Sequence, residues 1–177
     1  MNKLFIIGLP RTGTTSISVA LLEHNFKVAH TAYTKRAFEL ADAISDAPCF
    51  CDYPQLDTLF PGSKFVYLDR PLAAWLPSMQ RLLKKMYANL APKTGHFNPV
   101  LKRCFNSSFD LLSSAEPFSE QHLTLCYQRH QHAVKKYFAN RNDFLSIDIS
   151  QPTSFATLAQ FLNIPLKENK VFPRLNV

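Results

Sequence analysis

Short apolar runs alternate along the chain with segments whose apolar residues recur at helical spacing. The first run, residues 3–8, ends in glycine, as buried parallel strands often do, and residues 14–24 then carry apolar side chains at helical intervals. Further strand-like runs lie at 26–30, 64–69 and 143–149, with a fainter one at 43–47. Further helical stretches are predicted at about 34–42, 71–91, 119–139 and 153–162.

Strands that alternate with helices predict an α/β fold, because neighbouring parallel strands need crossover helices between them. We expect a mostly parallel sheet of about five strands with helices on both faces. The length of 177 residues fits one domain over residues 1–177. Residues 92–117 break the rhythm with Gly, Pro and Ser, and we interpret them as an insert that shapes a substrate site.

The composition is that of a globular protein with a basic surface. Apolar residues make up 46% of the chain and charged residues 19%, and the formal net charge is +7. The basic residues are scattered rather than clustered, and no nucleic-acid-binding motif is present. The charge therefore favours a small polyanion such as a nucleotide over nucleic acid.

The apolar run at residues 4–9 is too short for a signal peptide or a membrane span. We therefore expect a cytoplasmic protein without a membrane span. In such a protein we expect the four cysteines to be reduced thiols, and the spacing of Cys49 and Cys51 does not fit a zinc knuckle.

The segment Gly8 to Thr15 has the Gly-x-x-x-x-Gly spacing of a phosphate-binding loop, between a predicted strand and a predicted helix. Backbone N–H groups and the helix N-terminus can converge there on an anion. Thr14 stands where nucleoside triphosphatases have Lys, and Arg11 supplies a cation from inside the loop instead. The alternative interpretation is a simple strand-to-helix turn.

This loop resembles the 5′-phosphosulfate loop of the P-loop sulfotransferases, in which a basic residue is followed by Ser or Thr, Gly, Thr and Thr. A second sulfotransferase signature is a strand ending in Arg with Ser eight residues later, matched by Arg70 and Ser78. The resemblance implies a P-loop nucleotide-binding fold and 3′-phosphoadenylyl sulfate (PAPS) as co-substrate. It implies that Arg70 and Ser78 hold the 3′-phosphate and that the loop binds the 5′-phosphosulfate through Arg11, Thr12, Gly13, Thr14, Thr15 and Ser16.

The similarity is greatest to a compact sulfotransferase branch whose further motifs recur here in order. They are Asp46-Ala-Pro-Cys49, Phe60-Pro-Gly-Ser-Lys64, Arg70 through Trp75 to Ser78, and Phe172-Pro-Arg-Leu-Asn176. The chain lacks the Arg-Lys-Gly phosphate-clamping segment of the cytosolic small-molecule branch, for which Arg174 is a weak substitute. The insert at 92–117 matches no motif of the family, so the acceptor stays open.

The resemblance implies a metal-free transfer of a sulfuryl group to a hydroxyl or amine of a small-molecule or carbohydrate acceptor. Arg11 would stabilise the leaving phosphate. Relatives use His or Glu as the base, and Asp46 is nearest to that place, with Asp52 and His30 as alternatives. Since Asp has a reference pKa of about 3.9, Asp46 needs burial to act near neutral pH. Asp46 as a turn residue before Pro48, and Asp52 as a helix cap, are competing interpretations.

The sequence also allows other functions and other roles for some of these residues. A small P-loop kinase or a catalytically inert nucleotide-binding protein would share the fold. His122, Cys126 and His130 lie on one helix face but span about 12 Å along it, too far for one metal ion. Arg81, Lys84 and Lys85 fit a solvated helix surface better than an acceptor-binding patch. The oligomeric state stays open.

Overall fold

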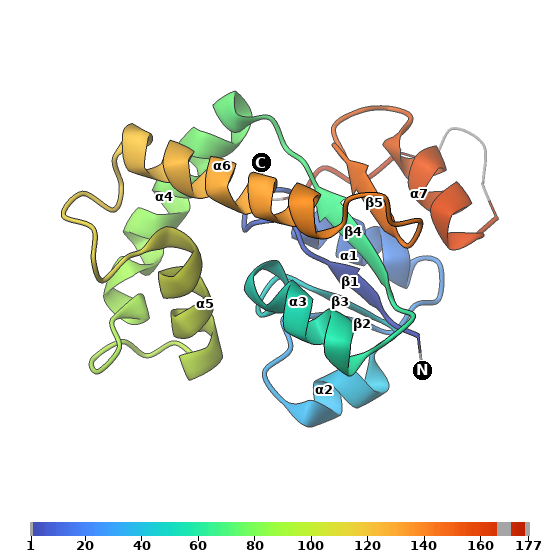
Figure 1. Ribbon diagram of the computed structural model, residues 1–177, viewed down its shortest axis with the longest axis horizontal. Coiled ribbons are helices and arrows are strands. Elements are labelled where there is room, and N and C mark those ends of the chain that lie inside the picture. Colours follow the sequence, from blue (N-terminus) through green and yellow to red (C-terminus); the bar gives the residue numbers. More distant parts are fainter. Residues whose placement is uncertain (1, 166–170, 176–177) are drawn as a thin grey trace.

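Five short parallel strands form the central sheet, in the order β2-β3-β1-β4-β5 (Figure 1). The computed structural model describes residues 2–165 and 171–175. The strands are β1 (Leu4–Ile6), β2 (Val28–His30), β3 (Ala43–Ser45), β4 (Lys64–Leu68) and β5 (Phe144–Ile147). The predicted α/β class is confirmed, and so is the faint strand at 43–47, which pairs with both β1 and β2.

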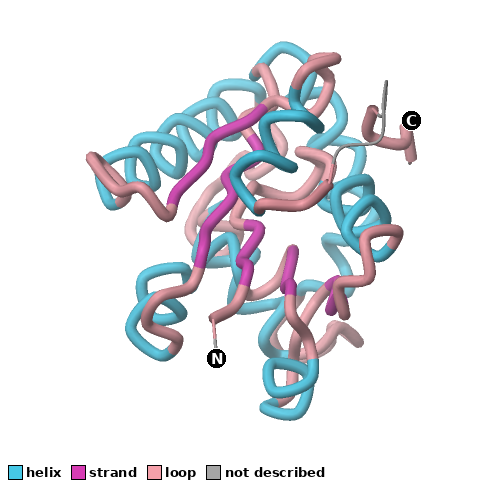
Figure 2. The backbone as a smooth tube through the Cα atoms, turned by 90° about the vertical axis from the view of Figure 1, so that its right-hand side faces the viewer, coloured by secondary structure: helices cyan, strands magenta, loops and turns pink. Residues whose placement is uncertain are grey.

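Helices connect the strands and lie on both sides of them, as the backbone trace in Figure 2 shows. Thr34, Asn98 and Ser119 begin three of these helices, each accepting a hydrogen bond from a backbone N–H in the first turn. The helices are α1 (Thr14–Leu22), α2 (Lys35–Leu40), α3 (Cys49–Leu59), α4 (Leu72–Leu90), α5 (Pro99–Phe109), α6 (Glu120–Tyr137) and α7 (Ser154–Leu162). None of those in the described part of the chain has the length and apolar character that crossing a membrane requires.

Alternate residues of each strand pack on opposite faces of the sheet, because side chains in a strand point alternately to either side. Leu4 and Ile6 pack in one core with residues of α1 and α7. Phe5 and Ile7 pack in a second core with residues of α3 and α6. The expected coverage of both faces is therefore confirmed.

A third core lies beside the sheet, where α4, α5 and α6 pack together (Figure 1). Trp75 of α4 stacks on Phe109 of α5, with ring centroids 6.3 Å apart. The segment at 92–117, which has an irregular sequence, thus contains the helix α5. Pro99 at its first turn and buried Phe105 are ordinary features of such a helix, but flanking Gly, Asn and Pro residues obscure the pattern.

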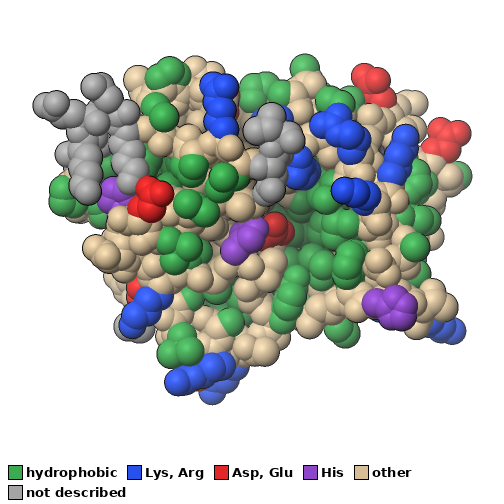
Figure 3. Space-filling view, turned by 180° about the vertical axis from the view of Figure 1, so that it is seen from behind, with side chains coloured by type: hydrophobic (Ala, Val, Ile, Leu, Met, Phe, Trp, Pro, Cys, Tyr) green, Lys and Arg blue, Asp and Glu red, His purple; other side chains and the backbone are tan. Residues whose placement is uncertain are grey.

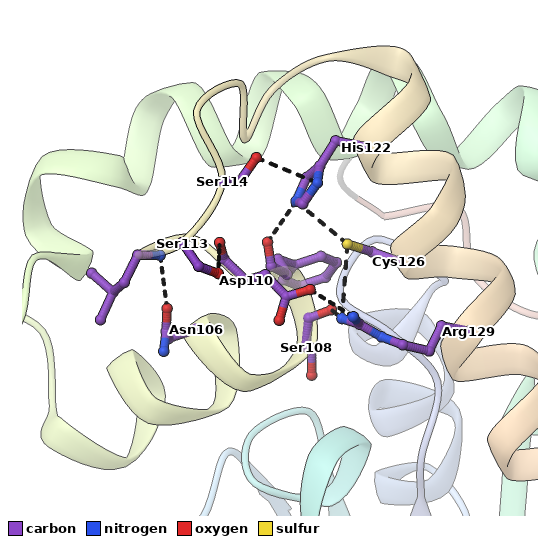
Figure 4. Close-up of polar contacts among 10 residues, drawn as sticks. Asn106, Ser108, Asp110, Ser113, Ser114, His122, Cys126 and Arg129 are labelled. Atoms are coloured by element: carbon purple, nitrogen blue, oxygen red, sulfur yellow. Dashed lines mark hydrogen bonds and ion pairs between the residues drawn. The ribbon is translucent and has the colours of Figure 1, made fainter.

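Polar contacts fix the end of α5 against the start of α6 (Figure 4). The His122 Nε2 atom lies 2.8 Å from the carbonyl oxygen of Phe109 and 3.5 Å from the Cys126 sulfur. Arg129 donates to the carboxylate of Asp110 at 2.6 Å. His122 and Arg129 of α6 therefore hold the end of α5, whereas the Cys126 sulfur contacts His122 and Arg129 of its own helix.

Candidate functional site

The phosphate-loop segment connects β1 to α1 and contains two glycines, Gly8 and Gly13. A larger residue at either position would force neighbouring atoms to move. A Cβ atom at Gly8 would lie 2.5 Å from the Thr12 hydroxyl, and one at Gly13 would lie 2.2 Å from Ile149. Gly13 also has a φ of 105°, which favours glycine. The Thr12 hydroxyl donates to the Leu9 carbonyl at 2.6 Å, so it stabilises the loop itself.

The N-terminus of α1 is arranged to receive an anion. Gly13 is its N-cap, no side chain caps the helix, and its first turn contains no acidic residue. Thr14, Thr15 and Ser16, which form that turn, line a cavity. Backbone N–H groups and the positive end of the helix dipole therefore point toward this space.

Three side chains, one from the loop after β4 and two from α4, hold the phosphate loop. Trp75 donates from Nε1 to the Pro10 carbonyl at 2.8 Å, which gives the buried Trp of the sequence motif a physical role. Arg70 donates to the Arg11 carbonyl at 2.7 Å. Arg11 donates from Nε to the Ser78 hydroxyl at 2.7 Å. The structure thus brings the two sulfotransferase-like signatures, the loop and the Arg70–Ser78 pair, into direct contact.

Side chains of helix α6 hold the backbone of Arg70 and the side chain of its neighbour Asp69. The Tyr127 hydroxyl donates to the Arg70 carbonyl at 2.6 Å and lies 3.2 Å from a carboxylate oxygen of Asp69. Gln131 and Lys135 also bind Asp69, at 2.7 and 2.9 Å. The turn that carries Arg70 is therefore braced by three consecutive turns of one helix.

Two cavities meet at the phosphate loop and share Gly13, Ser16, Arg70 and Leu175. We call the first, of about 270 Å³, the Asp46 cavity. It is lined by Pro10, Arg11, Gly13, Thr14, Thr15, Ser16, Thr31, Tyr33, Asp46, Arg70, Leu82, Met86, Leu101, Phe105 and Leu175. We call the second, of about 320 Å³, the Arg174 cavity. Besides the shared residues, it is lined by Thr12, Asp148, Ile149, Ser150, Gln151, Pro152, Val171, Phe172, Pro173 and Arg174.

Asp46 directly follows β3, and its carboxyl group lines the Asp46 cavity. Burial raises the pKa of this carboxyl, an effect that nearby His30 partly offsets. The Thr14 hydroxyl donates to Asp46 Oδ2 at 3.4 Å, and His30 Nε2 lies 3.9 Å from the same oxygen. Thr15 Oγ1 lies 3.3 Å from His30 Nε2. The structure thus groups Asp46, His30 and the first turn of α1.

Asp52 is positioned differently. It lies at a kink inside α3, where its own φ and ψ angles are not helical. The hydrogen bonds of its carboxylate go to the side chains of Cys51 and Arg103, so the predicted capping hydrogen bond is not formed among the described residues. Its carboxylate binds both terminal nitrogens of Arg103 on α5, at 2.8 and 2.5 Å, and Asp52 is not among the described residues around the Asp46 cavity. Ligand atoms of Cys51, Asp52 and Cys104 lie within 4.8 Å of one another, but the guanidinium already occupies the carboxylate. The geometry therefore disfavours Asp52 as the base.

Backbone strain is concentrated around the Asp46 cavity. Arg11, Thr31 and Asp46 have φ angles of 70°, 80° and 64°, in the left-handed region that non-glycine residues seldom adopt. Each such residue costs on the order of 1–3 kcal/mol, and such strain is typical of functional sites. All three residues line the same cavity.

Positive charge is dense beside the loop. Arg81, Lys84 and Lys85 of α4 line a hollow of about 590 Å³ together with Arg11, Ser78 and Leu82. Burial and the nearby charges of Arg70 and Arg81 lower the pKa of Arg11. Figure 3 shows Lys and Arg side chains gathered along one edge of a hollow lined by hydrophobic groups. The three α4 cations are therefore part of a site edge, in addition to being solvated.

Several cavity residues escape sequence reasoning. Tyr33 lies after β2, and Met86, Leu101 and Phe105 belong to α4 and α5. The helical spacing of Leu101 and Phe105 indicates that they share one helix face, whereas nothing near Tyr33 in the sequence predicts that it lines the cavity. Asn176 of the Phe-Pro-x-x-Asn motif lies outside the described residues.

Comparison with known proteins gives a family and a distant structural likeness. The family described as "Sulfotransferase domain" matches residues 22–177, so its match begins after the phosphate loop. A crystal structure of mouse sulfotransferase SULT7A1 complexed with PAP aligns with 94% of this chain and 61% of its own, at 13% identity and a TM-score of 0.46. A search of curated proteins gave no match. The chain therefore spans about three fifths of that solved structure.

Proposed function

Since this chain belongs to the sulfotransferase domain family, we propose that it moves a sulfuryl group from PAPS to a hydroxyl or amine of an acceptor. The observation that carries the proposal is the arrangement of two cavities on either side of one phosphate loop, with Arg70 in the wall of both. A donor and an acceptor can thereby meet at the N-terminus of α1.

The donor fits the Arg174 cavity and the loop. Burial lowers the pKa of Arg11, and the like charges of Arg70 and Arg81 lower it further, so a bound polyanion relieves repulsion. The helix N-terminus has no acidic side chain competing for that anion. Arg70, in the wall of this cavity, and Ser78, which lines the neighbouring hollow with Arg11, are proposed to hold the 3′-phosphate. Arg11, Gly13, Thr14, Thr15 and Ser16 are proposed to hold the 5′-phosphosulfate. Thr12 contributes by fixing the loop shape.

The bound co-substrate supplies a sulfuryl group on its 5′-phosphate, with 3′,5′-ADP as the leaving group. Arg11 and the α1 N–H groups are fixed before the reaction, so they stabilise charge on the leaving phosphate without reorganising. Asp46 is proposed to take the acceptor proton, because its carboxyl lines the cavity and burial raises its pKa toward the working range of a base. No metal is required by this scheme.

The acceptor is proposed to occupy the Asp46 cavity. Tyr33, Met86 and Phe105 give this cavity an apolar wall, whereas Arg11 and Asp46 lie at its polar end. A small molecule or a carbohydrate unit with an apolar face therefore fits, with the reacting hydroxyl or amine directed at Asp46.

The test is titration calorimetry of the purified protein with 3′,5′-ADP and, separately, with ATP and Mg²⁺, followed by turnover with an acceptor panel. Binding of 3′,5′-ADP in preference to ATP and transfer of labelled sulfate from PAPS are the expected results. Preferred binding of Mg-ATP favours a kinase. Tight 3′,5′-ADP binding without turnover on a broad panel favours a non-catalytic nucleotide-binding protein.

A further inference from the structure

A chain of hydroxyl groups runs from α1 to His30. The Ser18 hydroxyl lies 2.7 Å from the Thr14 carbonyl oxygen and 2.8 Å from the Ser45 hydroxyl. Ser45 Oγ in turn lies 2.7 Å from His30 Nδ1. Ser18 is 3% exposed and Ser45 is fully buried, so these contacts are shielded from water.

The direction of the chain follows from counting hydrogens. A carbonyl oxygen only accepts, so the 2.7 Å contact with Thr14 uses the single hydrogen of Ser18. Ser18 must then accept from Ser45, which uses the single hydrogen of Ser45. Ser45 must therefore accept from His30, whose Nδ1 atom carries the hydrogen. The neutral imidazole is thus left with a lone pair on Nε2.

That lone pair faces the reacting groups. His30 Nε2 lies 3.3 Å from the Thr15 hydroxyl, which can donate to it, and 3.9 Å from Asp46 Oδ2. The His30 side chain is 36% exposed, whereas that of Asp46 is 19% exposed. His30 is therefore the more solvent-exposed partner of the pair, and it offers a lone pair toward the Asp46 carboxyl.

We propose that Ser18 and Ser45 are positioning residues that hold His30 as the Nδ1–H tautomer, so that Nε2 receives the proton from Asp46 and passes it to solvent. This inference rests on the proposed sulfuryl transfer for the origin of the proton. The acceptor O–H or N–H bond breaks as the new bond to sulfur forms, and the bridging oxygen leaves with its electron pair on 3′,5′-ADP. The proton moves to Asp46 Oδ2, then crosses the 3.9 Å to His30 Nε2 through one bridging water, and is finally released to bulk water.

Removing either serine should reverse the tautomer. Without Ser45, His30 Nδ1 loses its acceptor, and the Asp46 carboxylate favours a hydrogen on Nε2. Without Ser18, the Ser45 hydroxyl is free to donate to Nδ1, with the same result. The two substitutions act by different routes, so agreement between them excludes a simple packing effect.

The primary test is nitrogen-15 NMR of histidine-labelled protein without ligands, at a pH where His30 is neutral. His30→Gln identifies the His30 signals among those of the 6 histidines. Wild type should show the hydrogen on Nδ1, whereas Ser18→Ala and Ser45→Ala should show it on Nε2. Wild type with the hydrogen on Nε2, or variants that keep the wild-type tautomer, would overturn the proposal.

Kinetics supply the second readout. Ser18→Ala and Ser45→Ala should lower kcat at least about 10-fold, part of the 10²–10⁴ typical of acid–base catalysis, with unchanged affinity for 3′,5′-ADP. The matched control is Ser63→Ala, a fully buried serine just before β4 whose hydroxyl accepts from the Lys3 N–H, and it should leave kcat and the His30 tautomer unchanged. An equal kcat loss in Ser63→Ala would contradict the positioning role. If no acceptor is turned over, the proposed function fails while the NMR result still decides the tautomer.

Discussion

Arg70 donates a hydrogen bond to the carbonyl oxygen of Arg11, 2.7 Å away, and so links the end of β4 to the middle of the phosphate loop. A guanidinium has five N–H donors, so others remain beside the two cavities that Arg70 lines. One side chain therefore shapes the loop and presents charge to a ligand.

Arg70→Ala should weaken binding of 3′,5′-ADP more than binding of adenosine 5′-phosphosulfate, which has no 3′-phosphate. The lost charge-assisted contact is worth about 1.5–3 kcal/mol. Titration calorimetry with both ligands measures the difference. Equal losses for the two ligands would show that Arg70 acts on the loop alone.

Arg11→Ala should lower turnover more than nucleotide affinity, because its charge is proposed to meet charge that develops only as the leaving phosphate forms. Arg11→Lys keeps the charge but loses the Nε donor to Ser78, so it should retain part of the activity. Steady-state kinetics with PAPS separates the two parameters. A change confined to KM would argue against a role in the transition state.

Asp46→Asn should reduce kcat by about 10²–10⁴, the usual contribution of a general base, with nucleotide affinity near that of wild type. Asp52→Asn is the control, since it removes the partly exposed ion pair with Arg103 and should cost no more than about 1 kcal/mol of stability. Normal turnover of Asp46→Asn combined with an inactive His30→Gln would transfer the role of base to His30.

The raised pKa of Asp46 also predicts a pH dependence of stability. The folded state binds the proton more tightly than the unfolded state, so the free energy of unfolding should fall as pH rises from the ordinary Asp pKa of 3.8 through the raised folded pKa. Asp46→Asn should remove this decline and be at least as stable as wild type near neutral pH. Chemical denaturation of both proteins across this range measures it; parallel curves would refute the burial argument.

His130 predicts the opposite trend at acid pH. Complete burial lowers its pKa from 6.5 to about 4, and its Nε2 atom lies 2.7 Å from the Phe50 carbonyl. Stability that is present above pH 6.5 should therefore be lost as pH falls through 4, by on the order of 3 kcal/mol. His130→Gln should flatten this part of the curve in thermal unfolding. His132→Gln, a more exposed neighbour on α6, is the control.

Gly13→Ala should destabilise the phosphate loop, because its φ of 105° is unfavourable for alanine and the new methyl group meets Ile149 at 2.2 Å. The strain is on the order of 1–3 kcal/mol, and affinity for 3′,5′-ADP should fall as well. Adding Ile149→Ala removes the clash but not the backbone strain, so the double variant should recover only part of the loss. Full recovery would show that the φ angle carries no cost.

The sequence predicts best what depends on neighbouring residues. The loop from Gly8 to Ser16 and the Arg70–Ser78 pair could each be predicted from a short stretch of sequence, because the spacing of their residues is itself the signal. Helix α5 was obscured by the Gly, Pro and Asn residues beside it, although Leu101 and Phe105 have helical spacing.

Contacts that only the tertiary fold creates could not be predicted. Ser18, Ser45 and His30 belong to three different elements, and nothing in their local sequences indicates that their side chains meet. The same holds for the pairing of Asp52 with Arg103, which turned an expected cap into a link between α3 and α5. Such contacts depend on the order of strands in the sheet, which a single sequence leaves undetermined.

The core formed by α4, α5 and α6 is distinct from the two cores that cover the sheet. The α5 side chains Leu101 and Phe105 reach the Asp46 cavity from this separate core, whereas the phosphate loop is built on β1 and α1. Under the proposed function, substitutions on α5 would change the surface that meets the acceptor and leave the elements that carry the phosphate loop intact. The choice of acceptor could then be altered by changes to one short helix.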